Sequence, residues 1–220
     1  MMHLRYEHSV EDKGGWDNRY RPHTLEEVLL PRRLKSRLIS FRDHQTSPAL
    51  LFYGAAGTGK TTTALALDPK ADLYHLNASS LNDKDLKRSD FECTMSAMPL
   101  IKGSNRRKLI ILDEADALTE RAQMSLRSMI EQYASSSWFV FVVNDLQRMI
   151  DPIQSRTVGI GFGLLKDAEE MEALMVDRCL SILRIEQRTV PIEAVRELVR
   201  RNSPDMRRVL NHLQFESTAA

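Results

Sequence analysis

A glycine-rich octapeptide at Gly54–Thr61 constrains the fold of this chain more than any other feature. Its letters, GAAGTGKT, fit the pattern G-x-x-x-x-G-K-S/T, in which backbone N–H groups wrap phosphates. The octapeptide follows the apolar run Ala49–Tyr53 and opens a helical pattern at Lys60–Leu67. A helix N-terminus behind a glycine turn adds positive potential where phosphates bind. The sequence therefore predicts an ATP site, with a chance glycine turn as the alternative.

The individual residues of this loop have distinct expected tasks. Lys60 should reach the β and γ phosphates, and the hydroxyl of Thr61 should ligate Mg²⁺. The residues of the loop that we expect to contact ATP are Gly54, Gly57, Thr58, Gly59, Lys60, Thr61 and Thr62.

A second motif ends the apolar run Leu109–Asp113. Asp113 closes this run, and an acidic residue at the end of a buried strand can hold Mg²⁺ from the side opposite Thr61. Glu114 follows directly and is placed to orient and deprotonate the attacking water. The alternative for the pair is a solvated helix start. The letters DEAD at this point also spell a helicase box, but no second helicase core or other helicase motif accompanies them.

Short apolar runs alternate with longer helical patterns up to residue 164, which favours a parallel α/β sheet. The expected strands are Ala49–Tyr53, Leu73–Asn77, Leu109–Asp113, Trp138–Val143 and Thr157–Phe162. The expected helices between them are Lys60–Leu67, Asp83–Met98, Thr119–Tyr133 and Pro152–Arg156.

The pattern changes after Gly163, and the rest of the chain is predicted to be helical. We expect residues 1–164 to form a core and residues 165–220 to form a three-helix satellite. Its predicted helices are Asp167–Leu183, Pro191–Arg200 and Pro204–Gln214, the last two beginning at a proline, and Ser203 is the expected N-cap of the last.

Composition sets limits on partners and location. The net charge is +1, so any contact with DNA must come from a local patch. The only two cysteines, Cys93 and Cys179, form no C-x-x-C motif, which favours a reduced cytosolic protein. No apolar run has membrane-spanning length, and the charged N-terminus is unlike a signal peptide. We expect a cytoplasmic protein without a membrane.

Several segments resemble one family, in order over about residues 16–212. The chain is similar to replication factor C small subunits and to the clamp-loader subunit of T-even-type phages, and the stretch Glu26–Pro31 leans toward the phage branch. The matching segments are Trp16–Pro22 with Thr24-Leu25, Leu76–Ser79, Asp113–Thr119 with Ala122-Gln123 and Leu126-Arg127, Gln154–Arg156 with Thr157 in place of a cysteine, and Pro204–Asn211.

This resemblance implies an AAA+ core whose five-stranded parallel sheet has the order 5-1-4-3-2, followed by a small helical lid domain. It assigns Asn144 as a first sensor of the γ-phosphate or the water, Arg207 as a second sensor from the lid, and Arg156 as an arginine finger for the neighbouring subunit. The alternatives are a strand-end turn residue, a solvated arginine and an ordinary surface arginine. The residues it places beside the adenine and ribose are Asp17, Asn18, Arg19, Tyr20 and Leu29. Asn77 is expected to restrain Glu114 or, equally, to cap its strand end.

Two features are candidates for contacts with DNA or a clamp. A basic loop beside the second motif could grip phosphates without reading sequence, or could be solvated; its basic residues are Lys102, Arg106, Arg107 and Lys108. Gln123 and Arg127 lie four apart and could pass DNA contact back to Glu114. The apolar stripe Phe91, Met95 and Met98 favours core packing over clamp docking.

The leading hypothesis from the sequence is an ATP- and Mg²⁺-dependent ATPase subunit of a sliding-clamp loader. Its expected partners are a sliding clamp, primer–template DNA and other loader subunits in a hetero-oligomeric ring. Family members carry a further helical collar after the lid, and this chain stops at Ala220 without one. The expectation is that the sequence is a fragment or that another chain supplies the collar. The alternatives are a nucleotide-gated binding module with little turnover and another AAA+ DNA-remodelling ATPase.

Overall fold

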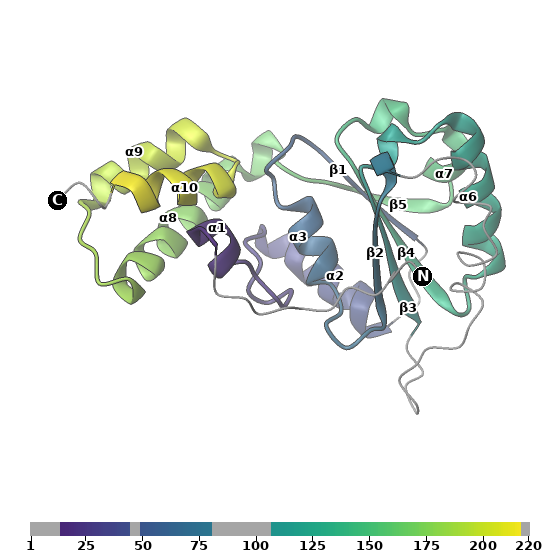
Figure 1. Ribbon diagram of the computed structural model, residues 1–220, viewed down its shortest axis with the longest axis horizontal. Helices are drawn as coiled ribbons and strands as arrows, with labels where there is room; N and C mark the ends of the chain where they lie inside the picture. The colour runs from purple at the N-terminus through teal and green to yellow at the C-terminus, as the bar shows by residue number, and fades with distance from the viewer. Residues whose placement is uncertain (1–13, 45–48, 81–106, 217–220) are drawn as a thin grey trace.

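The computed structural model describes residues 14–44, 49–80 and 107–216. In these residues a twisted sheet is covered by helices on both faces, and a group of helices lies beyond one end of it (Figure 1). No helix among them is long and apolar enough to cross a membrane.

All strand pairs in the described sheet are parallel. The strands are β1 Ala49–Tyr53, β2 Leu73–Asn77, β3 Lys108–Asp113, β4 Ser137–Val143 and β5 Thr157–Gly161. Their order is β2-β3-β4-β1-β5, which confirms the predicted order read from the other edge. Tyr53 pairs with Val143 and Asn77 pairs with Asp113, so the carboxyl ends of four strands meet at one edge.

Each face of the sheet packs against its own helices. The helices α2 Arg32–His44 and α3 Lys60–Leu65 share one hydrophobic cluster with Leu50, Ile111 and Val140. On the other face, α6 Glu120–Gln132 and α7 Asp151–Gln154 pack on the alternate strand residues. This division follows from the strand geometry, because successive side chains point to opposite faces. It also explains why β4 is buried at every position.

Three helices follow the sheet and have a core of their own. They are α8 Ala168–Ile185, α9 Ile192–Asn202 and α10 Met206–Glu216. Trp16, in the short helix α1 Trp16–Arg19, is 2% exposed and belongs to this third cluster. Its backbone N–H donates to Gln214 Oε1 at 2.9 Å. The segment around α1 therefore packs with the later helices, which differs from the expected division at residue 164.

Short 3₁₀ helices complete the described part: η1 Ala78–Ser80, η2 Ala115–Ala117, η3 Leu146–Arg148 and η4 Leu165–Asp167. The predicted helix Asp83–Met98 lies outside the described residues, as do Phe91, Met95 and Met98.

The predicted start of the last helix is wrong by two residues. The helix α10 begins at Met206 rather than Pro204, and Ser203 is instead the C-cap of α9. Asp205 Oδ1 accepts from the backbone N–H of Arg208 at 3.1 Å, so a carboxylate caps this helix.

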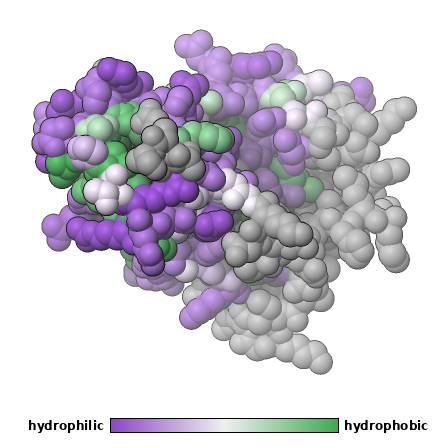
Figure 2. All heavy atoms as spheres, turned by 60° about the vertical axis from the view of Figure 1, so that its left-hand side comes forward, coloured by the Kyte–Doolittle hydropathy of each residue, from purple (hydrophilic) through white to green (hydrophobic). Residues whose placement is uncertain are grey.

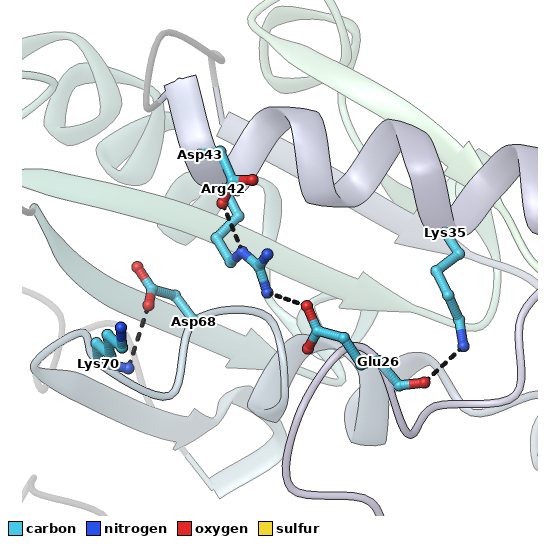
Figure 3. A network of polar contacts seen from close by, with 6 residues as sticks. All are labelled: Glu26, Lys35, Arg42, Asp43, Asp68 and Lys70. Atoms are coloured by element: carbon cyan, nitrogen blue, oxygen red, sulfur yellow. Dashed lines mark hydrogen bonds and ion pairs between the residues drawn. The ribbon is translucent and has the colours of Figure 1, made fainter.

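The segment before α2 is tied to that helix by a polar network (Figure 3). Arg42 donates to Glu26 Oε1 and to Asp43 Oδ1, both at 2.8 Å, and Lys35 Nζ donates to the backbone oxygen of Glu26 at 2.8 Å. The hydrogen bond from Arg42 lowers the pKa of Glu26. This anchoring fixes the loop that carries Leu29.

The described residues on the face shown in Figure 2 are mostly hydrophilic, with smaller hydrophobic areas between them. Ile185 and Phe215 are the most exposed large hydrophobic residues among those described, at 66% and 73%.

Candidate nucleotide-binding site

The phosphate-binding loop joins β1 to α3 and needs glycine at two positions for different reasons. A Cβ on Gly54 would lie 2.4 Å from the backbone oxygen of Phe162, in the strap after β5. Gly57 has φ +79°, and a Cβ there would lie 2.4 Å from the Asp205 carboxyl carbon. The loop is therefore held between this strap and the start of α10.

Lys60 connects the loop to the end of β4. Its Nζ donates to the backbone oxygens of Gly54 at 2.9 Å and Ala55 at 2.8 Å, and to Asn144 Oδ1 at 3.0 Å. Burial lowers the pKa of Lys60, while Asp113 and Asp116 act to raise it. Lys60 and Asn144, which were predicted from separate parts of the sequence, are therefore in direct contact.

Thr61 and Asp113 face one another across the start of α3. Thr61 Oγ1 donates to Asp113 Oδ1 at 3.2 Å, and the Glu114 backbone N–H donates to the same oxygen at 3.0 Å. Burial alone raises the pKa of Asp113, but hydrogen bonds from His75 and Thr61 outweigh it and leave the pKa below its ordinary value. A hydroxyl and an ionised carboxylate on adjacent elements fit Mg²⁺, which binds through oxygen and keeps some ligands for substrate phosphates.

His75 was not predicted as part of this group. Its Nε2 lies 3.4 Å from Asp113 Oδ2. The pairing of β2 with β3 aligns His75 with Ile111, so Asp113 is two residues further along the same face. Only the strand register could have indicated this contact.

Glu114 has an unusual backbone conformation. Its φ of 53° is left-handed, and its side chain is exposed and lines the same cavity as Lys60. A left-handed non-glycine residue costs about 1–3 kcal/mol, and such residues cluster at functional sites. The turn presents the Glu114 carboxylate to the cavity.

A cavity of about 350 Å³ lies between the phosphate-binding loop and the later helices. This volume is in the range of sites for small ligands. The predicted site residues that line it are Asp17, Tyr20, Leu29, Gly57, Thr58, Gly59, Lys60, Thr61, Thr62, Asp113, Glu114, Asn144 and Arg207. Lining residues that the sequence did not indicate include Arg21, Pro22, Val28, Met171, Met175, Arg178, Met206 and Leu210.

Three predicted ATP contacts do not line this cavity: Asn18, Arg19 and Gly54. Arg19 instead donates to Glu186 Oε1 at 2.8 Å, at the end of α8. Tyr20 donates to the same oxygen at 2.5 Å. The short helix α1 thus turns Arg19 toward α8, and Gly54 contributes its carbonyl oxygen to Lys60.

Arg156 lies at the end of α7, outside the cavity lining. Its Nε donates to Glu131 Oε1 at 2.5 Å and its NH1 to the Pro152 oxygen at 2.9 Å. The hydrogen bond from Arg156 lowers the pKa of Glu131. This arginine is not placed to serve the cavity of its own chain, and its role for a neighbour stays a prediction.

The prediction of a phosphate-gripping loop is wrong for Lys108. This residue begins β3 and is 1% exposed, with its Nζ over the Tyr74 ring at 5.6 Å. Arg107 is half-buried, with its guanidinium over the Trp138 ring at 5.8 Å, and burial lowers its pKa. Both cations pack against aromatic rings at the amino end of the sheet. Lys102 and Arg106 lie outside the described residues.

Gln123 is buried and contacts backbone groups, and its role in passing DNA contact to Glu114 stays a prediction. It is 1% exposed; its Nε2 donates to the Leu118 and Arg148 oxygens, and its Oε1 accepts from the Ile150 N–H at 2.9 Å. Arg127 is half-buried and its Nε has no hydrogen-bond partner in the described part, so its role with DNA stays a prediction.

Asn77 forms a cap at the end of β2. Its Oδ1 accepts from the Ser79 N–H at 2.9 Å and hydroxyl at 2.7 Å. This geometry supports the strand-end cap, which was one of the two alternatives for the residue.

The parallel sheet, the phosphate-binding loop and the carboxylates at the end of β3 define a P-loop nucleotide-binding protein. Residues 50–186 match the model of the ATPase family associated with various cellular activities (AAA), and the chain belongs to that family.

Curated relatives cover almost the whole chain. It is 36% identical over 209 residues to the replication factor C small subunit of Saccharolobus solfataricus, covering 92% of this chain and 61% of that protein. It is 34% identical over 212 residues to replication factor C subunit 5 of Homo sapiens, covering 93% and 60%. The chain therefore spans less than two thirds of the length of these relatives.

A solved structure of Thermotoga maritima RuvB has the same fold. Its TM-score is 0.67 at 16% identity, and the match covers 88% of this chain and 64% of that one. At this identity the likeness concerns the fold alone.

Proposed function

We propose that this chain is an ATP-hydrolysing subunit of a DNA sliding-clamp loader. The observation that carries the proposal is one cavity that gathers the phosphate-binding loop, Asp113, Glu114, Asn144 and Arg207. This cavity lies in a chain similar to replication factor C small subunits over 92% of its length.

Each residue has a part in this proposal that follows from its position. Lys60 turns from the loop carbonyls to the β and γ phosphates of ATP, while Asn144 remains beside it to contact the γ-phosphate. Thr61 and Asp113 would hold Mg²⁺, which would supply positive charge to neutralise the charge that develops on the phosphates. Glu114 takes the proton of the attacking water. Residues 165–220 act as a lid that brings Arg207 toward the phosphates.

The side of the cavity away from the phosphate-binding loop is suited to the adenine ring of ATP. Met175, Leu29 and Leu210 supply apolar surface there, and Tyr20 closes it beside α1. Tyr20 is tied to Glu186, so the position of this wall depends on the packing of α1 against the lid helices.

Two further functions remain as alternatives. A binding module that uses ATP only as structural glue would need neither Glu114 nor Arg156. Another AAA+ DNA-remodelling ATPase would have the same cavity, so only the identity of its partners would distinguish it from a clamp-loader subunit. The proposed partners are a sliding clamp, primer–template DNA and other loader subunits, in the cytoplasm.

Arg156→Ala tests the proposal in the assembled complex. An arginine supplied in trans to a P-loop enzyme is worth about 10³–10⁵ in rate. We expect the chain alone to bind ATP but to hydrolyse it slowly, and partner subunits, clamp and primed DNA to raise the rate. The substitution should remove most of that increase while ATP affinity stays unchanged, since Arg156 does not line its own cavity.

Arg196→Ala is the matched control, because Arg196 is an exposed arginine on α9. Steady-state ATPase assays and sedimentation of both variants measure the outcome. Full activity of the chain without partners, or of the complex that carries Arg156→Ala, would contradict the trans mechanism.

A further inference from the structure

One buried carboxylate fastens the end of β4 to the turn after β3. Asp116 lies in η2 and is 8% exposed. Its Oδ2 accepts from the backbone N–H of Asn144 at 3.1 Å and from that of Asp145 at 3.0 Å. A single oxygen thus receives two consecutive N–H groups, which fixes the backbone where β4 ends.

This contact determines where the Asn144 side chain points. The Asn144 side chain extends from a backbone position that Asp116 fixes, and its Oδ1 accepts a hydrogen bond from Lys60 Nζ at 3.0 Å. Without Asp116, the N–H groups of Asn144 and Asp145 would lose this acceptor, and the end of β4 would no longer be fastened to the turn after β3.

The same carboxylate is joined to the turn that carries Glu114. Asp116 is two residues from Glu114, and the Ala117 N–H donates to the Glu114 oxygen at 2.9 Å within this turn. The two elements fastened together are therefore the one that bears the proposed base and the one that bears the proposed γ-phosphate sensor.

We propose that Asp116 is a positioning residue that sets Asn144 and Glu114 in one frame around the γ-phosphate. This role rests on the proposed function as an ATPase, and it adds a residue that does not line the cavity and touches no substrate. The effect of Asp116 on γ-phosphate binding acts through the backbone of residue 144, so this effect requires the Asn144 side chain.

The test uses the full chain alone and compares two ligands, Mg²⁺-ADP and a non-hydrolysable Mg²⁺-ATP analogue. Asp116→Ala should weaken binding of the ATP analogue about tenfold and leave the affinity for ADP nearly unchanged, because only the analogue has a γ-phosphate. Asn144→Ala should have the same effect. Asp116→Asn keeps an acceptor oxygen at the same place, so it should preserve the preference for the ATP analogue.

A double variant separates positioning from general loss of structure. Asp116→Ala in the Asn144→Ala background should cost little further affinity, because the side chain through which Asp116 acts is already gone. Independent losses that add would overturn the proposal, as would equal weakening of ADP and the ATP analogue or an unchanged preference in Asp116→Ala.

Thermal melting shows whether Asp116→Ala folds. If Asp116→Ala does not fold, Asp116→Asn is the deciding variant. Loss of its preference for the ATP analogue over ADP would overturn the proposal, because asparagine keeps the acceptor oxygen. A wild-type chain that binds neither ligand would instead refute the proposed function itself, so the two failures are distinguishable.

Discussion

The two walls of the cavity are held in place by different kinds of contact. On the sheet side, Lys60 and Asn144 are joined at 3.0 Å, and Thr61 and Asp113 at 3.2 Å, within a fixed hydrogen-bonded frame. On the lid side, the lining is largely apolar, with methionines from α8 and α10, and Arg207 is exposed.

This difference separates chemistry from recognition. The sheet wall gathers its polar groups through hydrogen bonds among themselves, and when phosphates bind Lys60 exchanges the loop carbonyls for phosphate oxygens. The lid wall offers apolar area and two arginines, Arg178, which donates to the backbone oxygen of Tyr20, and the exposed Arg207. We therefore expect substitution of Glu114 or Lys60 on the sheet wall to reduce turnover or binding severely, and substitution of Arg207 on the lid wall to alter affinity more gently.

Among substitutions in the two walls, the largest effect is expected from Glu114→Gln, on the sheet wall. Glutamine keeps the size of the side chain but cannot accept the water proton, and general base catalysis contributes about 10²–10⁴-fold. Turnover in the assembled complex should fall by that factor while ATP affinity of the chain stays within about twofold. Glu120→Gln is the control, because Glu120 is exposed in the first turn of α6 and does not line the cavity. Wild-type turnover of the Glu114→Gln complex would show that Glu114 is not the base.

Lys60→Ala should have the next largest effect, on affinity rather than on rate. A hydrogen bond to a charged group contributes about 1.5–3 kcal/mol, and Lys60 is expected to contact two phosphates. We predict that ATP binding weakens by about a hundredfold or more, measured by nucleotide titration. Lys70→Ala is the matched control, since Lys70 is exposed in the turn after α3 (Figure 3). Equal ATP affinities of the wild type and Lys60→Ala would show that this loop does not bind the phosphates of ATP.

The sheet wall could be predicted from the sequence because its residues lie in contiguous motifs. A strand, a loop and a helix start fix the positions of Lys60 and Thr61 locally, and a parallel sheet brings Asp113 and Asn144 to the same edge. The prediction failed at the amino end of β3, the strand that ends at Asp113. Lys108 was assigned to a basic loop that could grip DNA phosphates or be solvated, but β3 begins at that residue and its side chain is buried, with Nζ over the Tyr74 ring.

The lid wall was harder to predict, because its residues come together only through tertiary packing. The sequence predicted a helix at Asp167–Leu183, but it could not show that Met171 and Met175 of α8 border the nucleotide cavity. The helix α2 was not predicted at all. It is rich in basic residues, and Leu38 is its only fully buried residue, so it lacks a wide apolar stripe.

The smallest effect is expected on the lid wall, from Arg207→Ala. Arg207 lines the cavity from the first turn of α10, where a cation opposes the helix dipole, so a nearby anion favours its position. Its exposure means that solvent screens its charge, and we expect ATP affinity to fall only about tenfold, with a smaller loss for ADP. Arg208→Ala is a close control, because the neighbouring residue is in the same helix turn, does not line the cavity and lies 4.0 Å from Asp205. Titrations of both variants with ADP and a non-hydrolysable ATP analogue measure the difference.

If Arg207→Ala weakened binding as much as Lys60→Ala, the lid wall would contribute as strongly as the sheet wall, and the contrast between the walls would not hold. If both arginine variants behaved alike, the effect would come from the charge of α10 as a whole rather than from a contact with the phosphates.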